Sequence, residues 1–158
     1  MQSINNLMKR VTELSLENSK NDYKEGGPFG ALITDKDGNI ISEARNTVLL
    51  NHDPTAHAEI NAIRLASEKL GSHDLKDCVL YTSCYPCPMC LGAIVWSNIK
   101  TVYYGNTKED AEDIGFRDNI IYELIKGNNN VININSKNRE ITIKAFDDYK
   151  KNNNKKIY

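Results

Sequence analysis

Apolar residues recur at spacings of three and four near the start of the chain, a pattern that predicts an amphipathic helix. This first stripe consists of Ile4, Leu7, Met8, Val11 and Leu14. A second stripe follows His57, and Gly71 after Leu70 indicates where that helix ends. A third helix is expected to begin at Pro88, because proline is favoured in the first turn of a helix. Residues 119–126 predict a shorter helix.

Short runs rich in apolar residues between and after these helices predict strands. They comprise residues 29–34, 40–45, 78–83, 100–104, 131–134 and 140–143. Because strands alternate with helices, the sequence predicts an α/β fold. The expected architecture is a three-layer α/β/α sandwich with a mixed, mostly parallel central sheet of about five strands. We find no internal repeat, so residues 1–158 are expected to form a single domain.

Composition narrows the class of protein. The chain has 158 residues, of which 40% are hydrophobic and 26% charged, as in an ordinary globular domain. Its net charge of −1 provides no overall positive field that would favour nucleic acid. The first residues lack a basic segment followed by an apolar run, and no apolar stretch approaches the roughly 20 residues that span a bilayer. We therefore expect a cytoplasmic protein.

Two short motifs carry the candidate chemistry. His57 and Glu59 open the second predicted helix, and Cys87 and Cys90 form a Pro-Cys-x-x-Cys motif at the start of the third. One histidine and two cysteines leave the fourth position of a tetrahedral zinc ion open, as catalytic sites require. Helix N-termini favour thiolate and hydroxide, and a carboxylate beside the histidine can carry protons. Motifs of these types in this order are the signature of zinc deaminases.

Other metal-binding side chains have simpler interpretations. His52 and His73 are expected to be loop histidines, and Cys78 in mid-strand a small buried apolar residue. Cys84 lies three residues before Cys87, as in an iron–sulfur run, but no further cysteine follows. A structural zinc ion with Cys84 as fourth ligand is an alternative that would leave the nearby glutamate without a role.

The chain resembles the cytidine deaminase-like superfamily of zinc deaminases, and within it the bacterial guanine deaminases. The general resemblance is carried by residues 26–31, 51–59 and 80–94. Residues 115–118 with Ile121-Tyr122, and the C-terminal residues 154–158, are similar to guanine deaminases and not to tRNA-editing adenosine deaminases. In one departure from the pattern, Tyr85 stands where these enzymes usually have glutamate.

The resemblance implies a role for each matching residue. The ligands of one zinc ion per subunit would be His57, Cys87 and Cys90, and Glu59 would be the catalytic proton shuttle. The residues around the base would be Asn46, Asp118, Phe29, Trp96 and Tyr158. Core packing remains an alternative for both Phe29 and Trp96. The resemblance also implies a homodimer and a pocket closed by Tyr158. Exchange of residues 128–158 between the subunits is one arrangement that would allow this.

The chemistry of Asp118 favours guanine as the substrate. A carboxylate only accepts hydrogen bonds, and guanine presents N–H donors at N1 and the 2-amino group, whereas N1 of adenine is an acceptor. An unpaired buried polar group can discriminate by about 10⁴-fold. A solvated or capping aspartate is the simpler interpretation of this residue.

Three functions follow from these observations. The first is hydrolytic deamination of guanine, a small purine base, to xanthine and ammonia. The second is a tRNA-specific adenosine deaminase or another nucleobase or nucleoside deaminase. A tRNA enzyme needs a basic surface. Lys150, Lys151, Lys155 and Lys156 supply some positive charge near the C-terminus, but the net charge of −1 argues against this function. The third is a non-catalytic zinc-binding module.

Overall fold

A four-stranded mixed sheet forms the centre of the protein in the computed structural model, which describes residues 2–158. The strands are β1 (Gly30–Thr34), β2 (Ile40–Arg45), β3 (Val79–Cys84) and β4 (Thr101–Asn106), in the order β2-β1-β3-β4. β1 pairs antiparallel with both β2 and β3, whereas β3 and β4 are parallel. The predicted mixed sheet is confirmed. The expectation of five strands is wrong, because the sheet has four. The expectation of mostly parallel pairing is also wrong, because two of the three pairings are antiparallel.

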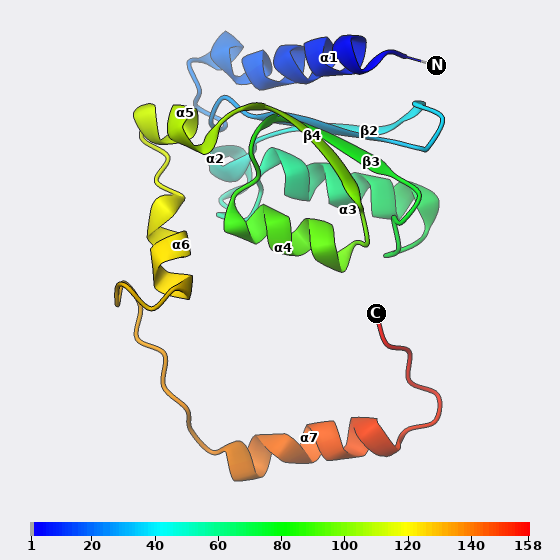
Figure 1. The fold of residues 1–158 in the computed structure, drawn as a ribbon, viewed down its shortest axis with the longest axis vertical. Helices are drawn as coiled ribbons and strands as arrows, with labels where there is room; N and C mark the ends of the chain where they lie inside the picture. The colour runs from blue at the N-terminus through cyan, green and yellow to red at the C-terminus, as the bar shows by residue number, and fades with distance from the viewer. Residues whose placement is uncertain (1) are drawn as a thin grey trace.

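Helices cover both faces of this sheet, which confirms the three-layer architecture (Figure 1). α1 (Ile4–Leu16) packs on one face and buries Leu7, Val11 and Leu14, three members of the predicted stripe. α3 (Ala58–Leu70) and α4 (Pro88–Trp96) lie on the opposite face (Figure 1). The central strands β1 and β3 are almost entirely buried, as expected for strands covered on both sides.

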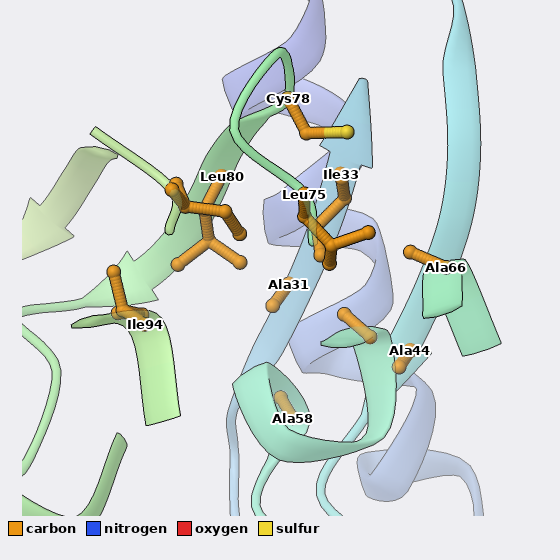
Figure 2. Close-up of a cluster of buried hydrophobic side chains, with 11 residues drawn as sticks. Ala31, Ile33, Ala44, Ala58, Ala66, Leu75, Cys78, Leu80 and Ile94 are labelled. Atoms are coloured by element: carbon orange, nitrogen blue, oxygen red, sulfur yellow. The ribbon is translucent and has the colours of Figure 1, made fainter. Parts of the chain in front are cut away.

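Small side chains bring α3 close to the sheet. Ala58, Ala62 and Ala66 are fully buried along one side of this helix. They face a cluster that includes Ala31 and Ile33 of β1 and Leu80 of β3, together with Leu75, Ile94 and Ile99 (Figure 2). Because alanine projects little beyond the backbone, α3 packs tightly and its N-terminus is held at a defined position beside the sheet.

On the opposite face, Gly30 brings α1 into contact with β1. A Cβ atom built on Gly30 would lie 2.6 Å from the Ser15 nitrogen and 2.7 Å from the Val11 carbonyl oxygen, both backbone atoms of α1. A backbone cannot move aside as a side chain can. The absence of a side chain at this position is therefore a requirement of the helix packing.

Five further helices complete the fold of residues 2–158. They are the 3₁₀ helix η1 (Glu17–Asn21), α2 (Val48–Asn51), α5 (Lys108–Asp113), α6 (Asn119–Ile125) and α7 (Arg139–Lys151). α6 confirms the short helix expected at residues 119–126. None of the helices in residues 2–158 is long and apolar enough to cross a membrane.

Two predicted strands near the C-terminus are wrong. Residues 131–134 form an exposed irregular segment, and residues 140–143 belong to α7. Alternation over four residues does not separate a strand from a helix, and the wider pattern of Ile141, Phe146 and Tyr149 fits one side of a helix. α7 lies away from the sheet, and the chain after it turns back toward α4 (Figure 1). None of the residues of α7 is buried.

Matched glycine substitutions test the packing of α1. Gly30→Ala should lower the free energy of unfolding by about 1–3 kcal/mol, the usual cost of overpacking. Gly92→Ala in α4 should be neutral or raise that free energy by up to about 1 kcal/mol, because alanine favours helix. A Cβ atom on Gly92 would meet no atom within 4 Å. Urea unfolding of both variants provides the measurement, and equal effects would contradict the contact described for Gly30.

Candidate active site

His57, Cys87 and Cys90 converge from the starts of two helices. His57 is the N-cap of α3 and Cys87 the N-cap of α4, both with extended backbone, and Cys90 lies in the first turn of α4. The ligand atoms of the three residues lie within 4.8 Å of one another. The Nδ1 atom of His57 is 3.5 Å from the Cys87 Sγ atom and 3.6 Å from the Cys90 Sγ atom.

These separations fit a zinc ion. Zn–S and Zn–N bonds of about 2.3 and 2.0 Å at a tetrahedral angle place sulfur and nitrogen about 3.5 Å apart. The donor set of one imidazole and two thiols suits zinc and leaves a fourth position for water or substrate. Cys84 is not a member of the cluster found within residues 2–158, and its Sγ atom contacts the Thr107 carbonyl oxygen at 3.6 Å. Burial raises the pKa of the Cys84 thiol to about 11, so this cysteine remains protonated.

The pKa values of the two cysteines in the cluster are shifted in opposite directions. A hydrogen bond from the Cys90 thiol, with a further contribution from His57, lowers the pKa of Cys87 to about 4, while the same contact raises the pKa of Cys90. The backbone N–H of Cys90 also donates to the Cys87 sulfur at 3.5 Å. Metal binding displaces thiol protons, so a cluster that already holds one thiolate is prepared for a cation.

Glu59 is buried directly beside the metal cluster. Its Oε1 atom accepts a hydrogen bond of 2.6 Å from the Thr82 hydroxyl, and its Oε2 atom lies 3.5 Å from the Cys90 sulfur. Burial raises the pKa of this carboxyl above its ordinary value, although the Thr82 hydrogen bond opposes the shift. A carboxyl group that takes up protons more readily is suited to accept a proton and return it.

A cavity of about 620 Å³ opens above the cluster. His57, Glu59 and Cys87 line it, together with the predicted site residues Phe29, Asn46 and Asp118. Phe116 also lines the cavity, and its ring meets that of Phe29 edge to face with centroids 4.9 Å apart. The rings form an apolar wall of a size suited to a flat heterocycle.

The side chain of Asn46 is held in one orientation. Its Oδ1 atom accepts hydrogen bonds from the backbone N–H groups of Gly27 and Val48, at 3.4 and 3.1 Å. Its Nδ2 group has no hydrogen-bond partner in the described part of the chain and is available to a molecule in the cavity. The fully buried Asn18 supports this loop by donating to the Gly27 and Asn46 carbonyl oxygens, each at 2.8 Å.

Asp118 presents a free acceptor to the same cavity. It is the N-cap of α6, and its carboxylate accepts no hydrogen bond from residues 2–158. Burial, together with the nearby charge of Cys87, raises the pKa of this carboxyl, and His57 opposes the shift. The cavity therefore combines a free amide donor and a free carboxylate acceptor with the metal cluster.

Two predicted site residues lie elsewhere. Trp96 at the end of α4 is 66% exposed, and Tyr158 packs near the rings of Trp96 and His73 with centroids 6.1 and 5.9 Å away. Neither residue lines the cavity of its own chain. Phe116 provides the second aromatic wall in this chain, where Trp96 was expected.

Sequence reasoning assigned no role to Thr82, Tyr85 or Phe116. Phe116 belongs to a segment that carries the resemblance to guanine deaminases, and Tyr85 is the one departure from that pattern. The sequence therefore pointed to both positions but did not predict what either side chain contacts. No sequence signal distinguishes Thr82 from any polar residue in a buried strand. Its partner Glu59 comes from a separate element, 23 residues earlier in the chain.

An α/β sandwich with a His-Cys-Cys cluster, an open fourth position and a buried carboxylate defines a zinc-dependent hydrolytic deaminase. Residues 1–106 match the family model described as the cytidine and deoxycytidylate deaminase zinc-binding region, and the chain belongs to this family.

Comparison with individual relatives shows which members of the family the chain is similar to. The chain is 52% identical to the guanine deaminase of Bacillus subtilis (strain 168) over 118 residues, which are 75% of this chain and 74% of the relative. A crystal structure of guanine deaminase from Bacillus subtilis matches with a TM-score of 0.90 and 41% identity, over 99% of each chain. The tRNA-specific adenosine deaminase of Haemophilus influenzae is 40% identical over 90 residues, 57% of this chain and 52% of the relative.

Cysteine substitutions test the ligand set. Cys87→Ala and Cys90→Ala should each lose stoichiometric zinc, because two remaining ligands cannot hold the ion tightly. Cys84→Ala is the matched control and should retain one zinc ion per chain. Metal analysis after gel filtration provides the measurement. Zinc retained by both ligand variants, with loss in the Cys84 variant, would assign the site to Cys84.

Proposed function

We propose that this protein catalyses the hydrolytic deamination of guanine to xanthine and ammonia. The observation that carries the proposal is the unpartnered Asp118 carboxylate in the cavity wall. It can accept hydrogen bonds from the N–H edge of guanine at N1 and the 2-amino group, and the free Asn46 amide can donate to an acceptor of the same base. The similarity to guanine deaminases supports this choice.

The chain's own residues would orient the base and move the protons. Phe29 and Phe116 would hold the ring in plane, while Asp118 and Asn46 set its rotation. Bound zinc would supply an activated water by lowering its pKa to about 7. Glu59 would take a proton from this water as the oxygen attacks C2, and pass it to the adjacent ring nitrogen. Glu59 would then take the second proton from the hydroxyl group formed on C2 and give it to the departing amine, which leaves as ammonia while the C2 carbonyl forms. Thr82 keeps the Glu59 carboxyl group aligned.

Adenosine in tRNA fits the site less well. N1 of adenine is an acceptor and would face the Asp118 carboxylate, another acceptor, without a proton between them. The lysines near the C-terminus are exposed, but the net charge of the chain is −1. The same donor requirement weighs against other bases that present an acceptor at this edge.

We further propose a homodimer, in which residues 128–158 of each subunit pack on the other. None of the residues of α7 is buried within its own chain, and the apolar side chains of Ile141, Phe146 and Tyr149 are exposed. Exposed apolar residues on the body, including Val95, Trp96 and Tyr104, offer a surface to cover. In a two-fold dimer, Trp96 and Tyr158 would together close the cavity of the other subunit. A cytoplasmic location completes the proposal and suits free metal-binding thiols.

A substrate panel tests the function. The zinc-loaded protein is incubated with guanine, adenine, cytosine and a tRNA anticodon stem, and ammonia is measured. Guanine should be the preferred substrate. Glu59→Gln should keep its zinc but lose at least about 10²-fold in kcat, the usual contribution of a proton-transferring group. Preference for the tRNA stem, or near-normal activity of the Glu59 variant, would contradict the proposal.

Mixed dimers test the exchange. A chain that lacks residues 152–158 is co-expressed with a Glu59→Gln chain under two affinity tags, and the doubly tagged dimer is purified. If the tail acts on the other subunit, each mixed dimer holds one complete site and should show about half of the wild-type activity. Each parent alone should be nearly inactive. Mixed dimers no more active than the parents would place the tail on its own subunit, and a monomer by light scattering would exclude the dimer.

A further inference from the structure

The position of Asp118 depends on its backbone. Its carboxylate accepts no hydrogen bond within residues 2–158, so no side-chain contact fixes it over the cavity. α6, which begins after it, has seven residues, none of them buried. Something other than core packing must therefore hold this helix against the site.

One anchor precedes Asp118 and a second follows it. Before Asp118 in the sequence, Phe116 packs edge to face on Phe29. On the far side, Tyr122 lies one helical turn later, and its N–H donates to the Asp118 carbonyl oxygen at 3.3 Å. Because the turn from Asp118 to Tyr122 is helical and therefore rigid, fixing Tyr122 fixes the backbone of Asp118, and Phe116 holds the chain two residues before it.

Lys108 provides the contact on the far side. This residue opens α5, and its Nζ atom lies over two rings, 4.9 Å from the centroid of Tyr122 and 5.1 Å from that of Tyr85. Lys108 takes part in no salt bridge within residues 2–158. The two rings contact its charge through cation–π attraction.

Tyr85 connects this contact to the metal cluster. It lies two residues before Cys87, and its backbone N–H donates to the Asn106 carbonyl oxygen at 2.8 Å. Its ring also meets that of Tyr104 in β4 at 5.1 Å, edge to face. Tyr85 is thus attached firmly to the sheet. We refer to Tyr85, Lys108 and Tyr122 as the tyrosine–lysine clamp.

We propose that the tyrosine–lysine clamp holds Asp118 at the distance from the metal cluster at which it recognises the base. The three side chains are positioning residues, and the inference rests on the proposed recognition of guanine by Asp118. The clamp acts through rings and charge: the Tyr122 hydroxyl oxygen is buried and has no hydrogen-bond partner. The hydroxyl therefore contributes nothing to the attachment.

Variants that remove the ring or the charge should weaken substrate binding, whereas variants that keep them should not. Lys108→Met should raise KM for guanine about 5- to 30-fold, the combined effect of two cation–π contacts, with kcat changed less. Tyr122→Leu removes one of the two contacts and should raise KM about 2- to 5-fold. Lys108→Arg and Tyr122→Phe retain the attraction and should behave as wild type. Lys126→Met is a matched control, since Lys126 at the C-terminal end of α6 pairs with Glu123 on the surface. An effect of Tyr122→Phe equal to that of Tyr122→Leu would overturn the proposal.

A double-mutant cycle shows whether the clamp acts through Asp118. Lys108→Met should add less than about twofold to KM in an Asp118→Asn background, because the carboxylate that it positions is already lost. Multiplicative effects would assign Lys108 a role independent of Asp118. Guanine binding to zinc-loaded Glu59→Gln protein, measured by equilibrium dialysis, repeats the comparison without turnover.

Amide hydrogen exchange separates the clamp from the proposed function. Exchange of residues 119–125 should accelerate in Lys108→Met and Tyr122→Leu and remain unchanged in Lys126→Met. Unchanged exchange in all three variants would overturn the clamp even if guanine is the substrate. Wild-type protein that neither binds nor deaminates guanine, with accelerated exchange in the two clamp variants, would overturn the proposed function and leave the attachment of α6 established.

Discussion

The N-termini of α3 and α4 meet beside the sheet, and the metal-binding cluster depends on this meeting. His57 and Cys87 are both helix caps, so their side chains are placed by where the helices begin. α3 can approach because its inner side is lined by alanines, and a larger residue at Ala58 or Ala62 would displace its first turn. Core packing on this face therefore sets the distances between the His57 nitrogen and the cysteine sulfurs.

The same packing creates the environment that Glu59 needs. A carboxylate in the first turn of α3 would ordinarily be solvated, but the sheet and the cluster exclude water from this one. Its only hydroxyl partner in the described chain is Thr82, which lies on the strand that leads to the cysteines. β3 therefore serves the site twice, since it delivers the cysteines at its end and supports the glutamate from its middle.

Most of the site could be predicted from sequence because its key residues are local. His57 and Glu59 lie within one helical turn, as do Cys87 and Cys90, and each pair is recognisable without knowledge of the fold. Four of the six predicted strands are also correct, since each is bounded by turn residues or by a helix start. Contacts between distant elements were not predictable, such as Thr82 with Glu59 or Lys108 with Tyr122. The strands expected at residues 131–134 and 140–143 failed because four alternating residues carry no information about what they will pack against.

The metal-binding part of the site and the part proposed to recognise the base are held in the fold in different ways. The zinc-ligand candidates and Glu59 sit on elements built into the core, whereas Asp118 sits on a short helix held by a few aromatic and cationic contacts at the periphery. Substitutions in this peripheral segment change neither the buried core nor the candidate zinc ligands. Evolution can thus vary which ring enters the cavity while the water-activating machinery stays constant. A scaffold divided in this way can diversify into enzymes for different bases without passing through an unfolded or metal-free intermediate.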